Sequence, residues 1–434
     1  MDMMKEKHII VISEDAMVFE DIQTLASLPN FGSVLPKAAV VEKVRTVYPS
    51  VTYPCHTSMR TGVTCGKHGI TNNEKPILNE LKSEWEWYND AVKVRDIFDA
   101  AHDAGMTSGA IIWPVTCRHK SIDYLVNWPP FNGPFNEELL LDSGCSPETI
   151  SEIIKPNIHM LDGMKRSSPM LEDFEHCCAA DIIRKFKPNL LMLHPANVDH
   201  ARHVSGVFSP VVDQALAQVD AWLGWILLAV REAGIEDSTD IFVVSDHGQI
   251  NISRVIALNA VLASHGLIDV DENGNVKDYV AMSKSSGASA HIYMKNPDNS
   301  AELERVYGVL QSLREDGVFG IDRVYTAQEA RDEEGLYGGF SFVVETDGYT
   351  SFSNDWKRPF VRNIDPSDYK FGRGTHGHNP DKGPQPTLIA FGPDIKPGVR
   401  VARKPIIDEA PTYAKILGIS LPDADGKPID EILL

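Results

Sequence analysis

Short apolar runs rich in β-branched residues alternate along this chain with longer segments of helical periodicity, and this alternation constrains its fold most strongly. Five runs have the length and composition of strands buried on both faces: HIIVIS (8–13), GAIIW (109–113), NLLML (189–193), DIFVVS (240–245) and TLIAFG (387–392). Three segments have helical patterns: 93–104, 148–154 and 210–232. The pattern predicts an α/β fold around a mostly parallel sheet.

Residues 255–374 differ in character from the chain on either side. They contain the strand-like stretches ASAHIYMKN and FSFVVET, the helix-like stretch SAELERVYGVLQSLRE, and acidic turns such as DVDENGN. At 434 residues the chain is long enough for one large domain with an insertion. We therefore expect a main α/β catalytic body at 1–254, an inserted α+β subdomain at 255–374, and a C-terminal return at 375–434 that completes the body.

The charge balance excludes one class of partner. Lys and Arg number 41 against 61 Asp and Glu, so the formal net charge is −20. Such a surface repels a polyphosphate chain, which argues against a nucleic-acid scaffold. A small phosphate-bearing substrate is still compatible with it, because bound metal ions can override the global field locally.

The N-terminal residues and the cysteines bear on the compartment. Residues 1–13 do not form a signal peptide, and no apolar run approaches the ~18 residues of a spanning helix. The six cysteines form no CxxC pair. We expect a cytoplasmic protein with reduced thiols and no membrane partner, or a periplasmic or secreted one if a leader has been removed. The oligomeric state is left open.

Carboxylates and imidazoles follow three of the predicted strands. Asp15 comes after 8–13, Asp199 and His203 after 189–193, and Asp246 and His247 directly after 240–245. In an open α/β sheet, ligands bind outside the carboxyl ends of the strands. The side chains are therefore expected to meet at one edge of the sheet.

Each of these motifs alone also fits a plain structural role. An Asp after a strand often forms a turn, SDHG (245–248) could be a glycine turn, and GRGTHGHNP (372–380) could be a glycine-rich loop. Together, six residues form the carboxylate and imidazole set of a two-metal hydrolytic site: Asp15, Asp199, His203, Asp246, His247 and His376. The set favours zinc, with manganese as a substitute.

A two-metal site suits phosphoryl transfer but needs a nucleophile, and Thr52 is the candidate. It stands in VTYPCHTSMRTG (51–62), which predicts a short helix ending at Gly62. One interpretation is an ordinary helix N-cap. The other is an activated hydroxyl, since a helix N-terminus favours an anionic oxygen.

These motifs, in this order, resemble the nucleotide pyrophosphatase/phosphodiesterase (type I phosphodiesterase) family of the alkaline phosphatase superfamily. The matching segments are TYPCH (52–56), RTGVTCGKHGITNN (60–73), VDHARHVSG (198–206), VVSDHGQ (243–249) and GTHGH (374–378). The resemblance implies an alkaline-phosphatase-like three-layer α/β/α sandwich with a smaller insert. It also implies cleavage of phosphodiester or pyrophosphate bonds in small nucleotide-like substrates.

The resemblance further implies a role for each residue. One zinc ion would be held by Asp199, His203 and His376, and the other by Asp15, Asp246, His247 and the Oγ of Thr52. Thr52 would attack phosphorus and form a phospho-threonine intermediate. Asn73, or its neighbour Asn72, would donate to a non-bridging oxygen, and Tyr53 would pack on a nucleoside base or against its own loop. Gln249 replaces the family's methionine in a supporting role, and His194 and His200 are expected to be ordinary loop histidines.

Three other functions remain open on the sequence. A phosphonoacetate-type phosphonate hydrolase would need a cation for the carboxylate, such as Lys120. A phosphomonoesterase would place Arg60 or Arg373 on the phosphate. A non-catalytic nucleotide-binding metalloprotein is the remote alternative, because Thr52 and every expected metal ligand are present.

Overall fold

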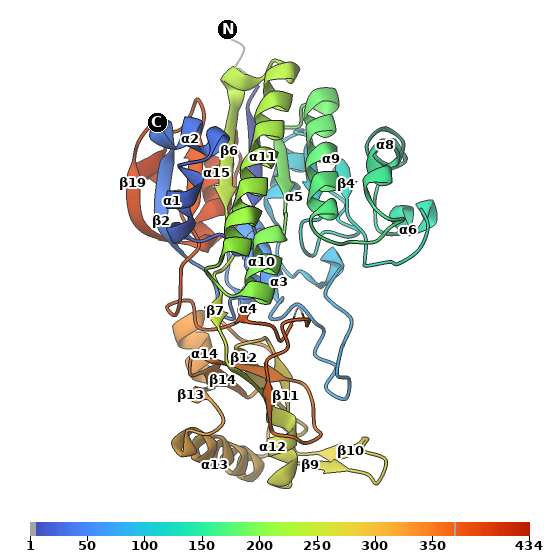
Figure 1. The fold of residues 1–434 in the computed structure, drawn as a ribbon, viewed down its shortest axis with the longest axis vertical. Coiled ribbons are helices and arrows are strands. Elements are labelled where there is room, and N and C mark those ends of the chain that lie inside the picture. The colour runs from blue at the N-terminus through green and yellow to red at the C-terminus, as the bar shows by residue number, and fades with distance from the viewer. Residues whose placement is uncertain (1–5, 369) are drawn as a thin grey trace.

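The computed structural model describes residues 6–368 and 370–434, and its centre is an eight-stranded sheet with the order β19-β2-β18-β6-β1-β5-β3-β4 (Figure 1). The strands are β1 (His8–Ser13), β2 (Ala39–Arg45), β3 (Ser108–Ile111), β4 (Tyr124–Val126), β5 (Leu190–Leu193), β6 (Thr239–Val244), β18 (Leu388–Phe391) and β19 (Arg400–Pro405). β18 runs antiparallel to both of its neighbours, and the other neighbouring pairs are parallel. The predicted mostly parallel sheet is confirmed.

Helices cover both faces of this sheet. In β1, Ile9 and Val11 belong to the core on one face and Ile10 and Ile12 to the core on the other, as the alternation of side chains along a strand requires. The first face is covered by α3 (Thr52–Thr61), α5 (Ile97–Asp103) and α15 (Glu409–Leu417), and the second by α9 (Met170–Phe186) and α11 (Pro210–Ala233). The expected three layers are present.

The predicted helices agree with the structure apart from their ends. Helix α5 begins at Ile97 rather than at 93, because the Asp96 side chain accepts hydrogen bonds from the backbone N–H groups of Phe98 and Asp99 and caps it. The 148–154 segment combines α7 (Pro147–Thr149) with a π-helical turn over Ile150–Ile154. The long helix α11 ends where Gly234 adopts a left-handed conformation, as expected.

A smaller lobe, which we call the lower lobe (residues 254–363), lies below this body in Figure 1. Its main sheet is antiparallel, with the order β11-β12-β14-β13. Its elements are β8 (Arg254–Ala257), α12 (Leu258–Ser264), β9 (Ile268–Val270), β10 (Val276–Tyr279), β11 (Ala281–Ser285), β12 (Ser289–Met294), α13 (Ser300–Asp316), β13 (Ile321–Thr326), α14 (Ala327–Glu334), β14 (Phe342–Thr346), β15 (Thr350–Ser353) and β16 (Val361–Asn363). The expected domain limits at 254 and 374 stay a prediction.

The shorter elements complete the body and connect its layers. They are α1 (Ile22–Leu25), α2 (Pro29–Val34), α4 (Cys65–His68), α6 (Glu137–Asp142), α8 (Lys155–Asn157), α10 (Asn197–Ser205), β7 (Ile250–Asn251) and β17 (Gly374–Thr375). Within the described part of the chain, no helix combines the length and the apolar character needed to cross a membrane.

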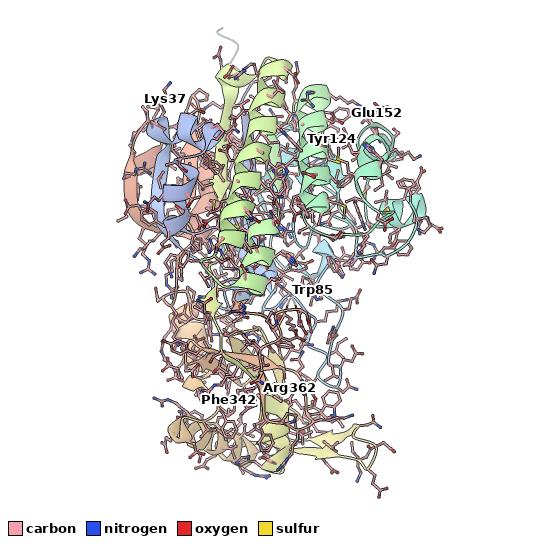
Figure 2. The ribbon with its side chains drawn as sticks, in the orientation of Figure 1. Lys37, Trp85, Tyr124, Glu152, Phe342 and Arg362 are labelled. Atoms are coloured by element: carbon pink, nitrogen blue, oxygen red, sulfur yellow. The ribbon has the colours of Figure 1, made fainter. Side chains whose placement is uncertain are left out.

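A long loop of the body, residues 72–88, joins the two parts of the molecule. Its Glu74 forms an ion pair with the buried Lys284 of β11 at 2.7 Å, and the same lysine donates to Ser83 Oγ at 2.6 Å. Leu78 packs against the lower-lobe core. Figure 2 shows Trp85 of this loop at the junction between the body and the lower lobe.

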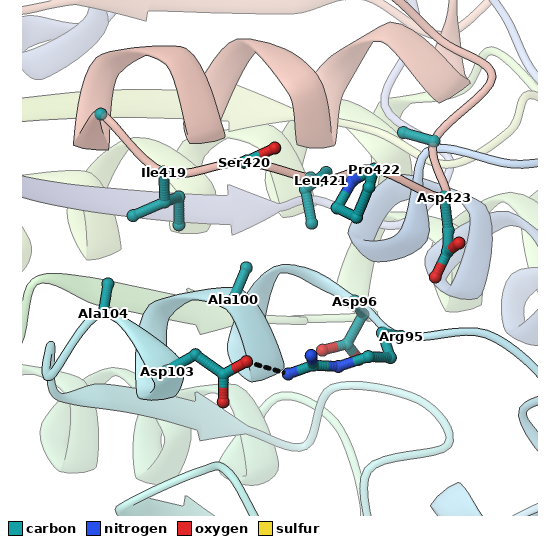
Figure 3. A pocket seen from close by; sticks show the side chains of 12 residues that line it. Arg95, Asp96, Ala100, Asp103, Ala104, Ile419, Ser420, Leu421, Pro422 and Asp423 are labelled. Carbon is teal, nitrogen blue, oxygen red and sulfur yellow. Dashed lines mark hydrogen bonds and ion pairs between the residues drawn. The ribbon is translucent and has the colours of Figure 1, made fainter.

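A surface crevice of the body contains none of the predicted site residues. It lies between α5 and the segment after α15, has a volume of about 310 Å³, and contains an Arg95–Asp103 ion pair at 2.5 Å (Figure 3).

Candidate active site

The six predicted metal ligands meet at the carboxyl edge of the sheet, in two groups of three. Asp15 follows β1, and Asp246 and His247 follow β6. Ligand atoms of these three residues lie within 4.8 Å of one another. The same limit holds for the second group, in which Asp199 and His203 lie one turn apart on α10 and are joined by His376.

His376 reaches the site through a small two-stranded sheet. β17 pairs antiparallel with β7, and β7 begins three residues after His247. As a result, the His376 ring centroid lies 4.2 Å from that of His247 and 5.1 Å from that of His203. The two groups therefore adjoin, as a site that binds two metal ions requires.

Two glycines allow the lower lobe to touch the backbone of this site. Gly377 has a φ of +94°, and a Cβ there would lie 1.7 Å from the carbonyl oxygen of Ser286. Gly287 has a φ of +85°, and a Cβ there would lie 2.5 Å from the carbonyl oxygen of His376. Ala288 N donates to the same carbonyl at 2.8 Å. The turn between β11 and β12 thus fixes the position of His376.

Thr52 is the first residue of α3, and the expectation that it caps this helix is wrong. The cap position belongs to Val51, whose backbone is extended (φ −129°, ψ 142°) and which makes no side-chain cap bond. The Thr52 hydroxyl is therefore not used on its own helix. Its Oγ1 lies 3.3 Å from His247 Nε2, where the helix N-terminus favours negative charge on oxygen.

The chemistry of the first group fits a divalent cation. Burial and the neighbouring carboxylates raise the pKa of Asp15 well above its usual range, and burial raises the pKa of Asp246 to about 8. Asp15 Oδ1 and Asp246 Oδ2 have no hydrogen-bond partner among the described residues. Burial also lowers the pKa of His247 well below its usual range, so its imidazole is neutral and can ligate. A cation would pair both oxygens and offset their repulsion.

The second group is held in place by residues around it. Gln249 Nε2 donates to Asp199 Oδ1 at 2.5 Å and to the Asp199 carbonyl at 3.1 Å. His203 Nδ1 lies 2.8 Å from the Gly374 carbonyl, and its Nε2 lies 3.3 Å from Asp199 Oδ1. Hydrogen bonds of this kind orient metal ligands. Gln249 thus lies where its expected supporting role places it.

His194 differs from its expected role as an ordinary loop histidine. Its Nε2 lies 3.0 Å from Asp15 Oδ2, and its ring centroid lies 4.2 Å from that of His56. His56 in turn has its Nε2 2.9 Å from Ser13 Oγ. His194 therefore positions a predicted metal ligand, and it lines the large cavity described below together with His200.

The structure distinguishes between the two candidate asparagines. Asn73 Oδ1 accepts a hydrogen bond from the backbone N–H of Tyr53 at 2.8 Å, which places the Asn73 amide beside the first turn of α3. Asn72 Nδ2 instead donates to the Ser285 carbonyl and to Ser286 Oγ, each at 3.0 Å. Of these two amides, that of Asn73 thus lies next to Thr52, and its Nδ2 group makes no hydrogen bond to another described residue.

Two cavities adjoin the site and share the Trp85 side chain. The large one has a volume of about 800 Å³, begins at Asp15 and Thr52, and has Tyr53 and Trp87 among its walls. The ring centroid of Tyr53 lies 5.1 Å from that of Trp85 and 5.6 Å from that of Trp87. The small cavity has a volume of about 90 Å³ and lies beside His203 and His376, lined also by Asn73, Glu74 and Lys370. Tyr53 is thus a pocket wall, as expected.

The cations proposed for the rival functions do not reach either cavity. Arg60 is fully buried and forms an ion pair with Asp96, so it cannot contact a substrate phosphate. Lys120 and Arg373 are exposed and line neither cavity. The structure therefore gives no support to the phosphate and carboxylate roles that the alternative functions would assign to these three residues.

Comparison with known proteins places the chain in a family. The family model described as "Type I phosphodiesterase / nucleotide pyrophosphatase" matches residues 9–378. Human ectonucleotide pyrophosphatase/phosphodiesterase family member 5 is 22% identical over 279 residues, which are 62% of this chain and 50% of the relative. The rat family member 1 is 24% identical over 422 residues, which are 90% of this chain and 38% of the relative. The chain thus spans half or less of the length of these curated relatives.

Solved structures give the same fold. Murine ectonucleotide pyrophosphatase/phosphodiesterase 5 superimposes with a TM-score of 0.69 at 20% identity, covering 99% of this chain and all of that one. The human counterpart also has a TM-score of 0.69, at 18% identity, with 98% of this chain covered. Because the family model spans most of the sequence and includes every predicted site residue, this chain belongs to the type I phosphodiesterase/nucleotide pyrophosphatase family.

Proposed function

We propose that the protein is a two-zinc hydrolase that cleaves phosphodiester or pyrophosphate bonds in nucleotide-like substrates, with Thr52 as its nucleophile. The observation that carries this proposal is the position of the Thr52 hydroxyl. It lies at the start of a helix, 3.3 Å from His247 Nε2 and at the mouth of a large cavity, and it is not used to cap the helix.

The residues present suit two zinc ions, with manganese as a substitute. Asp199, His203 and His376 would hold one ion, and Asp15, Asp246, His247 and Thr52 the other. Bound ions would supply positive charge that neutralises the phosphoryl oxygens and lowers the pKa of the threonine hydroxyl.

The side chains of the site account for the remaining requirements of the reaction. Thr52 Oγ attacks phosphorus as the bond to the oxygen opposite it breaks, giving a phospho-threonine that still carries the retained ester group of the substrate. Water then hydrolyses the bond between Thr52 and phosphorus and releases the phosphate monoester. Asn73 Nδ2 donates to a non-bridging oxygen as its charge grows. The N-terminus of α3 favours the negative charge that gathers beside Thr52.

Relatives support the nucleotide-like class of substrate. One relative, from Xenopus laevis, is named a bis(5'-adenosyl)-triphosphatase, and it is 22% identical over 58% of this chain. The murine relative was solved in complex with AMP as an inactive variant in which alanine replaces a threonine. The cations named for the phosphonate and phosphomonoester alternatives, Lys120, Arg60 and Arg373, line neither cavity.

A substrate panel tests the proposed function directly. The zinc-loaded protein should hydrolyse a nitrophenyl phosphodiester and a dinucleoside polyphosphate faster than nitrophenyl phosphate or phosphonoacetate. Release of nitrophenol or of nucleotide would be followed under initial-rate conditions. If none of the four compounds is cleaved, the proposed function fails, and preferred cleavage of phosphonoacetate would favour the phosphonate hydrolase instead.

Asn73→Ala should lower kcat by about 100-fold with little change in KM, because the amide is proposed to bind the oxyanion that forms only in the transition state. Asn275→Ala is the matched control, since Asn275 lies in an exposed turn between β9 and β10 and lines neither cavity. Steady-state kinetics on the nitrophenyl diester measure both variants. Equal losses in the two variants would contradict the assignment to Asn73.

Trp85→Ala should raise KM for nucleotide substrates about tenfold while changing kcat less, because the ring forms part of both cavities and stacks on Trp87 at a centroid distance of 5.7 Å. The control is Trp225→Ala, which removes a tryptophan that is 39% exposed on α11. Titration with nucleoside monophosphates as product inhibitors gives the affinity independently. Unchanged inhibition constants in Trp85→Ala would contradict its role as a binding wall.

A further inference from the structure

The large cavity contains a cation that the proposed reaction does not use. Arg166 lies in the segment between α8 and α9 and lines this cavity together with Thr52, Asp15 and Trp87. Its Nη1 donates to the Trp128 carbonyl at 2.9 Å, and its Cζ lies 5.5 Å from the centroid of the Trp87 ring. The guanidinium is thus held by one backbone bond and one aromatic face.

Arg166 also has no carboxylate partner within the described ranges 6–368 and 370–434. The buried or ring-stacked arginines Arg60 and Arg118, by contrast, pair with Asp96 and Asp142. A guanidinium carries five N–H donors, and the bond to Trp128 uses one of its nitrogens. In a chain of net charge −20, a cation with unused donors in a cavity wall points to an anionic ligand.

The carboxylates nearest this part of the cavity do not take the place of a ligand. Glu84 lines the cavity but forms an ion pair with Lys75 at 2.6 Å. Glu175 is fully buried, and burial together with the neighbouring Glu172 raises its pKa well above its usual range, although the charge of Arg166 opposes this shift. Among the described residues no ion pair joins Glu175 to Arg166. The positive charge of Arg166 is therefore available to the cavity.

The geometry points to Arg166 as the binding site for a second anionic group, a carboxylate or a phosphate, on the part of the substrate that stays attached to phosphorus after the first step. This inference rests on the proposed function. In-line attack by Thr52 places the departing oxygen opposite Thr52, and we assign this oxygen to the small cavity of about 90 Å³ beside His203 and His376. The retained group then occupies the cavity of about 800 Å³, which begins at Thr52.

The walls of the large cavity suit the organic part of such a substrate. Trp85, Trp87, Ile112 and Pro114 give it an apolar and aromatic lining, with Arg166 and two serines, Ser167 and Ser168, among its polar groups. A substrate that carries both an aromatic or sugar portion and a second anion would use both kinds of wall. Arg166 would therefore determine specificity rather than take part in bond cleavage.

The experiment compares three thymidine 5′-(p-nitrophenyl phosphate) substrates on the zinc-loaded protein: the 3′-hydroxyl, the 3′-O-carboxymethyl and the 3′-phosphate forms. We expect kcat/KM to be about 10- to 100-fold higher for at least one anionic form than for the 3′-hydroxyl form, since charge-assisted hydrogen bonds contribute on that scale. Which anionic form is preferred distinguishes a carboxylate from a phosphate ligand. In Arg166→Gln, the ratio of kcat/KM for the preferred anionic form to kcat/KM for the 3′-hydroxyl form should fall to about one.

Two further variants make the result specific. Arg166→Lys should keep part of the preference for the 3′-phosphate, because a lysine preserves the charge but not the two-pronged geometry. Arg118→Gln is the matched control, because Arg118 also lies over an aromatic ring, that of Tyr88 at 4.4 Å, but lines neither cavity. Arg118→Gln should keep the wild-type ratio of kcat/KM between anionic and neutral substrates. A wild-type ratio of one, or an unchanged ratio in Arg166→Gln, would overturn the inference.

Binding measurements separate this inference from the proposed function. Calorimetry with thymidine 5′-monophosphate and thymidine 3′,5′-bisphosphate needs no turnover, so it applies even if none of the three diesters is cleaved. At least tenfold tighter binding of the bisphosphate, lost in Arg166→Gln, would support the anion site. Equal binding of the two nucleotides by the wild-type protein would overturn it.

Discussion

Replacing Thr52 by alanine is expected to lower kcat about ten-thousand-fold or more, since the variant lacks the oxygen that attacks phosphorus. The substitution should leave the fold intact, because the Thr52 hydroxyl does not cap α3 and its nearest polar contact is the His247 ring. Initial rates on a nitrophenyl diester measure the loss. If Thr52→Ala retained a tenth of the wild-type rate or more, Thr52 would not be the nucleophile.

Two controls separate loss of the nucleophile from damage to the helix. Thr61→Ala removes a hydroxyl at the far end of α3 that donates to the Thr57 carbonyl at 2.6 Å, so kcat should stay within a few-fold of wild type. Thr52→Ser keeps a hydroxyl and should retain measurable turnover. Rapid acid quenching followed by mass spectrometry should find the phosphoryl group with its retained ester group attached to Thr52 in the wild-type protein and no adduct in Thr52→Ala.

The fold could be predicted from the sequence because its central strands are buried on both faces. The strand HIIVIS is buried along its whole length. Such a strand can be recognised from its continuous apolar, β-branched run alone, without knowledge of the neighbouring strands. Five of the six candidate metal ligands followed from the same logic, since residues after parallel strands meet at one edge. His376 came from the glycine-rich stretch 372–380 instead. The juxtaposition of the six ligands in two groups of three agrees with that prediction.

The residues that sequence reasoning missed come from loops whose paths depend on tertiary contacts. Trp85 reaches the site because loop 72–88 packs against the lower lobe through Glu74 and Lys284, a contact that no local pattern contains. Arg166 lies in an irregular segment for the same reason. The Glu-Trp-Glu-Trp stretch that ends at Trp87 did carry a signal, because alternate residues of an extended chain project to the same side.

The mistaken cap at Thr52 has a different cause. Residue type gives only the preference of a threonine for the cap position, whereas the cap itself is defined by backbone angles. Here the extended residue is Val51, so the helix begins one residue later than a capping role for Thr52 would require. A poor capping residue in that position leaves the threonine hydroxyl available to the site.

Removal of metal by chelation is expected to abolish turnover and to make the remaining protein less stable as the pH rises above 7. Burial raises the pKa of Asp246 in the folded chain to about 8, from an ordinary value of 3.8. Between these values the folded state holds a proton that the unfolded state has lost. The free energy of unfolding therefore falls as pH rises, by up to about 1.4 kcal/mol per pH unit for one such group.

The histidines of the site make the free energy of unfolding rise with pH, but only at lower pH values than those at which the carboxylates act. Burial lowers the pKa of His376 to about 4 and that of His247 well below its usual 6.5, so their contribution grows with pH only up to about 6.5. Above pH 7 the carboxylates therefore determine how the free energy of unfolding changes with pH. Denaturant unfolding of the metal-free protein between pH 7 and 8.5 should thus show a falling stability, and Asp246→Asn should show a shallower fall because its amide does not ionise.

Metal binding should reverse the fall in stability with rising pH, because a bound cation favours the ionised form of the carboxylates, which burial disfavours in the metal-free protein. Binding then releases a proton from Asp246, and zinc affinity should rise by up to tenfold per pH unit until about pH 8. Competition with a chelator of known affinity at several pH values measures the slope, and zinc added back should restore both turnover and stability. Zinc affinity that does not change with pH over this range would mean that Asp246 is already ionised before the metal arrives. The raised pKa would then not describe the site, and the repulsion between its carboxylates would have to be relieved by the protein itself.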